Sequence, residues 1–81
     1  MGRVRAAAAK TLGDIKDPSA VPALIAALGD RHADVRKNAA WALGELRDPR
    51  AAEALSAILN DSDPTAPRLA GQSLKKLRSA R

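Results

Sequence analysis

The fold is decided by the segment Val35–Pro49, which reads VRKNAAWALGELRDP. Between Val35 and Leu46 the apolar residues recur every three or four positions, the spacing that places them on one face of an α-helix. This helix is expected to end near Asp48, because a residue that precedes proline is disfavoured in the α region. Pro49 favours the start of another helix, because its fixed φ suits a first helical turn. The segment therefore predicts two helices joined by a sharp turn.

The same pattern occurs one unit earlier in the chain. When Val4–Asp34 is aligned with Val35–Thr65 at an offset of 31 residues, 14 of the 31 positions are identical. A second step of 31 leads to Ala66, where a degenerate third copy begins and stops after its first helix. A single helix pair cannot bury its apolar face alone, and stacking against neighbouring pairs solves this. We therefore expect an all-α fold, an α-solenoid of about two and a half helical hairpins.

Five antiparallel helices follow from the periodicity and the turn signals, at residues 3–15, 19–28, 34–46, 50–59 and 65–78. No stretch alternates with period two, so no strand is expected. Asp34 and Thr65 are candidates to cap the helices that follow them. The predicted organisation is a single repeat domain over residues 1–81, which is either a whole protein or a fragment of a longer array.

Composition excludes several classes of protein. Cysteine is absent from the 81 residues, which excludes a disulfide framework and thiolate chemistry. No apolar run approaches the roughly 18–20 residues that span a bilayer, and no secretory signal precedes a cleavage site. Tryptophan is the only aromatic type and occurs once, which argues against a stacking platform for bases or a flat cofactor. We therefore expect a soluble cytoplasmic protein without membrane contact.

The net charge of +5 comes from the C-terminal end. Residues 1–63 carry nine basic and nine acidic side chains, which cancel. The excess lies in residues 64–81, which contain no acid and five basic residues: Arg68, Lys75, Lys76, Arg78 and Arg81. This cluster either attracts phosphate or an acidic partner, or is a solvated last helix whose cations suit its own C-terminal dipole.

The segment quoted above resembles the HEAT-like repeat of phycobilisome lyases, VRxxAAxALGxIxDPxAVPxLIxAL, and Arg3–Asp30 matches it almost throughout. The resemblance covers residues 3–77 and implies stacked hairpins whose second helices, 3–15, 34–46 and 65–78, line one continuous surface. Proteins of this type include chromophore lyase subunits, scaffolding modules and artificial binders. The third copy departs from the family at Pro67 (for arginine), Lys75 (for glycine) and Gln72 (at the position of Trp41).

The second helices carry the candidate binding surface. A helical wheel of about 100° per residue places Trp41 on the side opposite the apolar stripe. Tryptophan is enriched at binding hot spots, and polar neighbours supply a rim. We expect a protein partner to bind the outward residues of these helices, which are Lys10, Asp14, Lys37, Asn38, Trp41, Glu45, Arg68, Gln72 and Lys76. The alternative for Trp41 is that it packs against a neighbouring helix.

Arg5 and Arg36 are expected to have a structural role. Each lies at the edge of its apolar stripe, where a guanidinium can reach a carbonyl at a helix end or a loop carboxylate. The candidate carboxylates are Asp17, Asp30 and Asp48. Pro67 removes this tie in the third copy, so a looser C-terminus is expected.

The open ends of the array and its glycines also carry expectations. Gly13 and Gly44 lie inside predicted helices, where their small size permits close packing. The N-terminal face of helix 3–15 is expected to be exposed and apolar, because the chain opens on a second helix. This indicates excision from a longer solenoid or self-association through uncapped ends, as a homo-oligomer.

Catalysis finds little support. His32, the only histidine, lies alone in a predicted turn, and the residues for a four-ligand metal site are absent. We expect no catalytic residue, cofactor or metal, and a non-enzymatic interaction or scaffold module that binds a protein. The alternatives are binding of nucleic acid or an acidic partner through the basic C-terminal helix, a chromophore lyase subunit or its fragment, and an engineered repeat protein.

Overall fold

The computed structural model describes residues 2–79. These residues form α1 (Gly2–Ile15), η1 (Pro18–Ala20), α2 (Val21–Ala27), α3 (Ala33–Leu46), η2 (Pro49–Ala51), α4 (Ala52–Ile58) and α5 (Ala66–Arg78), where η marks a 3₁₀ turn. No strand occurs within the described range. The expected all-α solenoid is confirmed.

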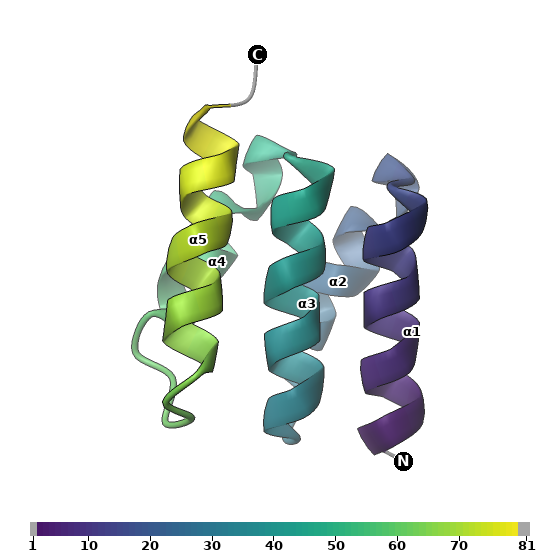
Figure 1. Ribbon diagram of the computed structural model, residues 1–81, viewed down its shortest axis with the longest axis vertical. Helices are drawn as coiled ribbons and strands as arrows, with labels where there is room; N and C mark the ends of the chain where they lie inside the picture. The colour runs from purple at the N-terminus through teal and green to yellow at the C-terminus, as the bar shows by residue number, and fades with distance from the viewer. Residues whose placement is uncertain (1, 80–81) are drawn as a thin grey trace.

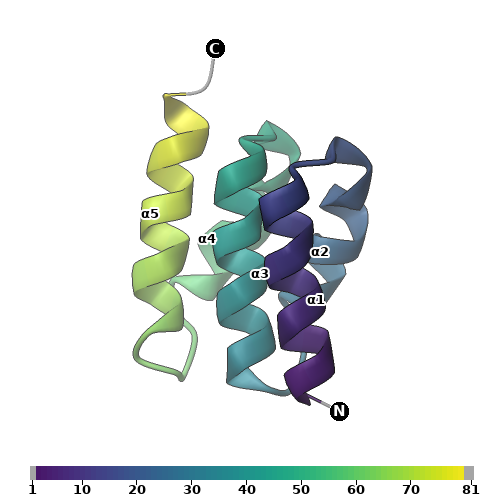
Figure 2. The same cartoon turned by 45° about the vertical axis from the view of Figure 1, so that its right-hand side comes forward.

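The helices form two layers. The long helices α1, α3 and α5 lie side by side and run in the same direction, from the N-terminus at the foot of α1 to the C-terminus above α5 (Figure 1). The shorter helices α2 and α4 lie behind them (Figure 2). The most extensive contacts between helices are those of α1 with α3 and of α3 with α5. We call α1, α3 and α5 the front layer, and α2 and α4 the back layer.

Each back-layer helix begins with a 3₁₀ turn that the periodicity does not predict. The side chains of Asp17 and Asp48 accept hydrogen bonds from the backbone N–H of Ser19 and Arg50, both at 2.9 Å. Each carboxylate therefore caps its own turn, while proline occupies the first position of that turn. The backbone bond from Ser19 is the main cause that lowers the pKa of Asp17. The pKa of Asp48 is lowered mainly by the side chain of Arg50 and further by the Arg50 backbone bond.

The helix caps predicted at Asp34 and Thr65 are wrong. Asp34 lies within the first turn of α3, and the Thr65 side chain makes no capping hydrogen bond. Asp63 caps α5 instead, because its Oδ2 accepts from the N–H of Thr65 at 2.9 Å and of Ala66 at 3.0 Å. At the other ends, α1 and α3 are followed by Lys16 and Arg47 in the left-handed conformation, with φ of 60° and 53°.

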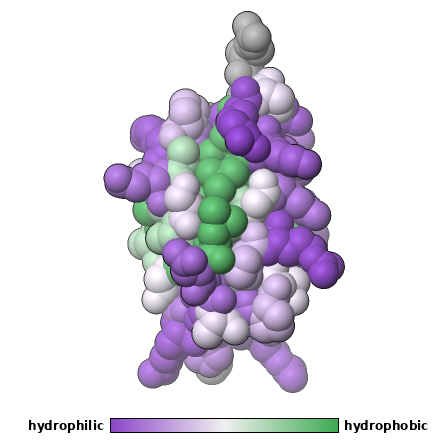
Figure 3. Space-filling view, turned by 90° about the vertical axis from the view of Figure 1, so that its left-hand side faces the viewer, coloured by the Kyte–Doolittle hydropathy of each residue, from purple (hydrophilic) through white to green (hydrophobic). Residues whose placement is uncertain are grey.

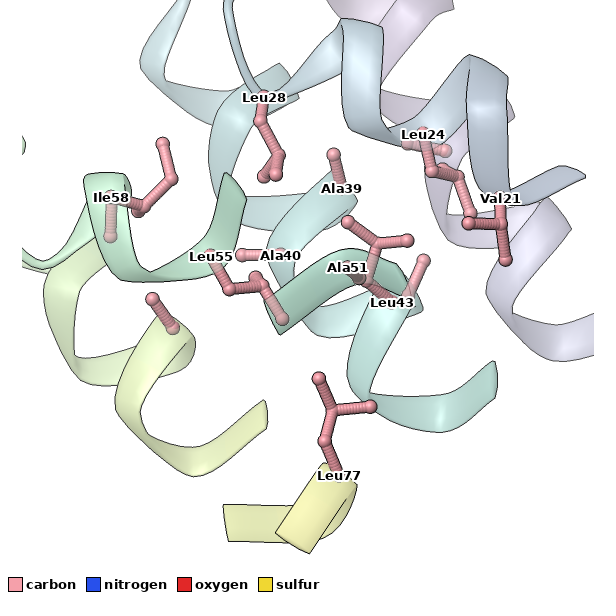
Figure 4. Packing of buried hydrophobic residues seen from close by; sticks show 14 of the residues in the cluster. Val21, Leu24, Leu28, Ala39, Ala40, Leu43, Ala51, Leu55, Ile58 and Leu77 are labelled. Carbon is pink, nitrogen blue, oxygen red and sulfur yellow. The ribbon is translucent and has the colours of Figure 1, made fainter. Parts of the chain in front are cut away.

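The core lies between the two layers (Figure 4). Its largest fully buried side chains come from α2, α3 and α4, and they are Leu24, Leu43, Leu55, Val21 and Val35. Alanines complete it: Ala39, Ala40 and Ala51 are fully buried. Burying one leucine stabilises the fold by about 1.5–3 kcal/mol, so the few large residues contribute most of the apolar burial energy.

Glycine sets the distance between front-layer helices. A Cβ on Gly13 would lie 2.7 Å from Cζ3 of Trp41, and a Cβ on Gly44 would overlap Ser73. At this close approach Ser73 Oγ donates to the backbone oxygen of Ala40 at 2.6 Å. The prediction that Gly13 and Gly44 permit close packing is confirmed.

Arginines of α1 and α3 bind the turns that follow α2 and α4, respectively. Arg5 Nε donates to Asp30 Oδ2 at 2.6 Å, and Arg36 Nε donates to Asp61 Oδ2 at 2.7 Å. Arg36 Nη1 also donates to the backbone oxygen of Asp30 at 2.8 Å, so this residue links two successive turns. These guanidinium bonds are the main cause that lowers the pKa of Asp30 and of Asp61.

The structural role expected for the two arginines is confirmed, and so is Asp30 as a partner of Arg5. The candidates Asp17 and Asp48 are wrong. They lie after the C-terminal ends of α1 and α3, whereas the arginines lie near the N-terminal ends of these helices. Asp48 pairs instead with Arg50, whose Nη2 lies 2.7 Å from Asp48 Oδ2.

Two glycine-to-alanine variants test the role of close approach. Gly44→Ala is expected to destabilise the fold by about 1–3 kcal/mol, because the new methyl group overlaps Ser73. Gly71→Ala on α5 is the matched control, since a Cβ there meets no atom within 4 Å. It is expected to stabilise by about 0.5–1 kcal/mol through helix propensity alone. Urea unfolding followed by circular dichroism measures both, and equal effects would refute the steric explanation.

Removing Arg36 tests the arginine ties through their pH dependence. Arg36→Met is expected to lower the free energy of unfolding at pH 7 by about 2 kcal/mol, because Asp61 loses its charged partner. The pKa of Asp61 is lowered in the folded state, so its stabilisation is present above the unfolded pKa of about 3.9 and is lost as pH falls further. The difference between wild type and variant should therefore shrink in acid.

Arg5→Met is the comparison variant for this experiment. Arg5 is more exposed than Arg36, with 40% against 15% of the side chain accessible, so its removal should cost less. Urea unfolding at neutral pH and at about pH 3 measures each difference. A loss in Arg36→Met that is the same at both pH values would contradict the ion-pair explanation.

Candidate interaction surface

Residues one repeat apart occupy equivalent places on the front-layer helices, so the candidate residues form rows across the layer. The first row is Lys10, Trp41 and Gln72, and the second row is Asp14, Glu45 and Lys76. We call these the tryptophan row and the glutamate row. Both cross the seams at which α1 meets α3 and α3 meets α5.

Trp41 is half-buried at the seam between α1 and α3. Its ring covers Gly13 and packs against the apolar core. Lys10 Nζ lies 5.6 Å from the ring centroid, within range of a cation–π interaction. The ring does not point only to solvent, because the missing side chain at Gly13 leaves room for it to pack on α1. The alternative that Trp41 packs against a neighbouring helix is therefore confirmed. The part of the ring that stays accessible is held by these contacts.

Asn38 ties two helices together instead of pointing outward. Its Nδ2 donates to the backbone oxygen of Ala6 at 2.9 Å, from α3 across to α1. The expectation that Asn38 lies on the open surface is therefore wrong, and the physical reason is again the short distance between these helices. Lys37, its neighbour, is partly buried, and its Nζ lies 3.1 Å from Asp34 Oδ1.

The glutamate row consists largely of charges that neutralise one another. Glu45 forms an ion pair with Lys76 of α5, and Lys16 Nζ lies 4.0 Å from its other oxygen. The hydrogen bond from Lys76 is the main cause that lowers the pKa of Glu45. Asp14 pairs with Lys10, one helical turn away, at 3.2 Å. The structure thus joins α3 to α5 by charge at this row.

The candidate residues Arg68 and Gln72 are exposed on α5. Lys75 and Arg78 of the basic C-terminal cluster are exposed as well, whereas Lys76 is engaged with Glu45. Arg81 lies outside the described residues. The structure therefore groups Lys10, Asp14 and Trp41 at one seam, and Glu45 with Lys76 at the other.

His32 is not as solitary as its sequence position indicates. It precedes α3, and its Nδ1 accepts from Arg5 Nη2 at 3.0 Å and lies 3.5 Å from Asp30 Oδ1. These contacts stabilise the turn between the layers. Within residues 2–79, no three histidine, cysteine or acidic side chains are grouped so that they could hold a metal ion. No helix in that range is long and apolar enough to cross a membrane.

An apolar groove lies at each end of the array. The N-terminal groove, between α1 and α2, has a volume of about 340 Å³. The expected exposed apolar residues are present on α1, where Val4 and Ile15 are 62% and 63% accessible. The C-terminal groove, between α4 and α5, has a volume of about 550 Å³. It is lined by Pro49, Ala52, Ser56, Leu59, Gly71, Leu74, Leu77 and Arg78.

Sequence reasoning missed the C-terminal groove, although the repeat contains the signal for it. Leu59 and Leu74 stand one period after Leu28 and Leu43, which are buried core residues. Apolar residues at core positions of the last two helices, with no further first helix to cover them in the described range, indicate an open groove.

The profile of the HEAT repeats family matches residues 2–75. No curated protein matches the chain. HEAT repeats are generally protein-interaction scaffolds and are typically non-enzymatic. The 31-residue period, the two-layered stack of hairpins and this match over nearly the whole sequence agree. The chain therefore belongs to the family of HEAT repeats.

Proposed function

We propose that the chain is a non-enzymatic interaction module that binds a protein partner through the front layer, around Trp41. The observation that carries this proposal is the half-buried Trp41 ring at the seam between α1 and α3, with Lys10 beside its face. A large aromatic side chain in this position can contribute both to the fold and to a binding surface.

The packing of Trp41 favours its use as an anchor. The ring rests on Gly13 and against the core, so little side-chain entropy is lost when a partner covers the rest of it. Tryptophan is among the residue types most enriched at interface hot spots, where a fixed ring is surrounded by polar residues that exclude water. Lys10 lies beside the ring, and Lys37 precedes Trp41 by one turn of α3. Arg68 and Gln72 are exposed polar residues on α5 of the same layer.

The charges of the front layer bear on the chemistry of the partner. The carboxylates of Asp14 and Glu45 are paired with lysines of the same surface. The exposed Arg68 has no acidic residue on its own helix. A partner that presents carboxylates opposite α5 and an apolar contact opposite Trp41 would therefore fit this surface.

Substitution of Trp41 tests the proposal. Trp41→Ala is expected to weaken partner binding by at least 2 kcal/mol, about thirtyfold, because a central anchor is lost. Trp41→Leu should keep Gly13 covered, so its fold should be more stable than that of Trp41→Ala. It should nevertheless lose most of the partner binding. Affinity capture from a lysate of the source organism, with quantitative mass spectrometry, compares the proteins retained by wild type and by each variant.

The matched control lies on the opposite layer. Glu53 is exposed on α4, so Glu53→Lys changes surface charge away from the front layer. Proteins that bind the proposed surface should be retained by Glu53→Lys and lost with both Trp41 variants, while thermal melting shows that all variants are folded. Equal retention by Trp41→Leu and wild type would refute Trp41 as the anchor.

A second candidate function is binding of nucleic acid through α5, which the exposed Arg68, Lys75 and Arg78 favour. We expect affinity for a DNA or RNA duplex to fall steeply as salt is raised. In a plot of log affinity against log salt concentration, the slope should become shallower by about one unit for each phosphate contact that is removed. Replacing all three residues by glutamine should abolish binding measured by fluorescence anisotropy. Affinity that does not change with salt would exclude this function.

Two narrower predictions accompany the proposal. The resemblance to the phycobilisome lyase type of repeat, in Val35–Pro49 and in Arg3–Asp30, stays a prediction. Self-association, which the exposed apolar residues of α1 at the N-terminal end favour, also stays a prediction, and sedimentation velocity over a wide range of concentration tests it.

A further inference from the structure

The interior of the array shows how the groove between a back-layer helix and the next front-layer helix is filled. Ala51 and Leu55, from η2 and α4, lie among Leu28, which directly follows α2, and Ala40 and Leu43 of α3 (Figure 4). Leu55 and Ala51 are fully buried there. The groove between α2 and α3 is therefore filled by α4, the first helix of the next hairpin.

The C-terminal groove is the equivalent surface one repeat later, and no helix among the described residues 2–79 covers it. Leu59 is 45% accessible, whereas Leu28, one period earlier, is 5% accessible. Leu74 is partly exposed, whereas the equivalent Leu43 is fully buried. Gly71, at the position of Ala40, has open space on its Cβ side. Figure 3 shows this end of the molecule, with an apolar stripe along it and polar side chains on both sides.

The front-layer side of this end differs, because it is closed by polar residues. Lys75 stands one period after Gly44, and Gly44 allows α5 to approach α3 closely. A lysine side chain at that place prevents a further front-layer helix from stacking at the same distance. Pro67 likewise replaces the arginine that ties the next turn in earlier units. The end therefore fits one back-layer helix and not a complete hairpin.

A second copy of the chain does not supply such a helix. The apolar stripes of its α2 and α4 are already buried, with Leu24 and Leu55 at 1% and 0% accessible. The N-terminal end also presents a groove, and two grooves do not fill each other. Contact between two C-terminal ends would bring like charges together, because Arg68, Lys75 and Arg78 lie on α5 and residues 64–81 contain no acid.

These charges indicate the chemistry of the occupant. Arg78 lines the groove itself, and Lys75 is exposed on the same helix. Carboxylates on the flank of a bound helix would meet this rim and would be attracted to it at low and physiological ionic strength. The apolar part of the occupant is set by the interior example, in which the buried residues are spaced as Ala51, Leu55 and Ile58.

We propose that the C-terminal groove binds a short amphipathic α-helix of a partner protein, with a small and two large apolar residues at spacings of four and three and with acidic flanks. This surface is distinct from the one around Trp41. Both can be occupied at once, because the groove lies between α4 and α5 whereas Trp41 lies between α1 and α3.

The chain contains a suitable probe. A synthetic, fluorescently labelled peptide of residues 48–61, DPRAAEALSAILND, contains η2 and α4, which fill the groove between α2 and α3. Its side chains include three carboxylates and one arginine. Fluorescence anisotropy with the full chain should show saturable binding that weakens as salt is raised. The control peptide Leu55→Asp should bind at least about tenfold more weakly, because its central apolar contact is lost.

Matched protein variants locate the binding site. Leu59→Glu should weaken binding by about tenfold or more, whereas Ile15→Glu, at a still more exposed apolar position at the other end, should leave it unchanged. Gly71→Leu is a second blocking variant, because it fills the groove at a place where no atom obstructs the new side chain. Reversing Lys75 and Arg78 to glutamate should weaken binding severalfold. Trp41→Leu should have no effect, which separates this proposal from the function proposed above.

Three results would overturn the proposal. The first is the absence of saturable peptide binding to wild type. The second is binding that does not depend on the apolar contacts: Leu59→Glu and Gly71→Leu leave it intact, or the Leu55→Asp peptide binds as tightly as the original peptide. Attraction between charges alone would then explain the binding. The third is sedimentation of wild type as a dimer that Leu59→Glu dissociates, because a second copy would then cover the groove.

Discussion

The structure depends on the short distance between neighbouring front-layer helices. A stripe of alanine and glycine on each of α1, α3 and α5 lets the backbones approach, and Gly13 and Gly44 lie where any side chain would collide with the next helix. The approach brings backbone carbonyl oxygens within reach of side chains across the seam. Asn38 and Ser73 donate to such oxygens, at Ala6 and Ala40. Helices packed around large side chains would stand too far apart for these bonds.

The arginine ties complement this packing by fixing the order of the turns. Apolar stripes of leucine and alanine allow neighbouring helices to slide, because dispersion contacts have little directional preference. The two-point bonds of Arg5 to Asp30 and of Arg36 to Asp61 are directional and occur in both of the first two units. Arg36 also reaches the backbone of Asp30, so one guanidinium positions two turns relative to each other. Pro67 ends this series in the third unit.

The fold is predictable from the sequence because its signals are local. The helices of Val35–Leu46 and its equivalents follow from apolar spacing, and the turns follow from Asp-Pro pairs, whose effects act on neighbouring residues. The stacking follows from the repeat itself. The 3₁₀ turns at Pro18 and Pro49 escape prediction, because they depend on an aspartate side chain folding back onto the backbone two residues later.

The candidate site is less predictable, because a helical wheel treats each helix as isolated. Asn38 and Trp41 lie on the outer side of the wheel, yet both contact α1 once Gly13 brings that helix close. The partner of Glu45 is Lys76, which is 31 residues away and has no local signal. Knowing which outward residues meet the neighbouring helix requires the distance between helices, and that distance is a property of the packed array.

A perfect 31-residue repeat would present the same residues at every unit, so the features that distinguish one surface from another must lie where the copies differ. Trp41 replaces the lysine found at position 10 and the glutamine found at position 72, and it alone adds a large ring to the front layer. Lys75 replaces glycine and closes the front layer at one end. The back layer keeps Leu59 at its core position and stays open there. The surface around Trp41 thus arises from a residue that one copy alone carries, whereas the C-terminal groove is built from shared apolar residues and bordered by a residue, Lys75, that departs from the repeat.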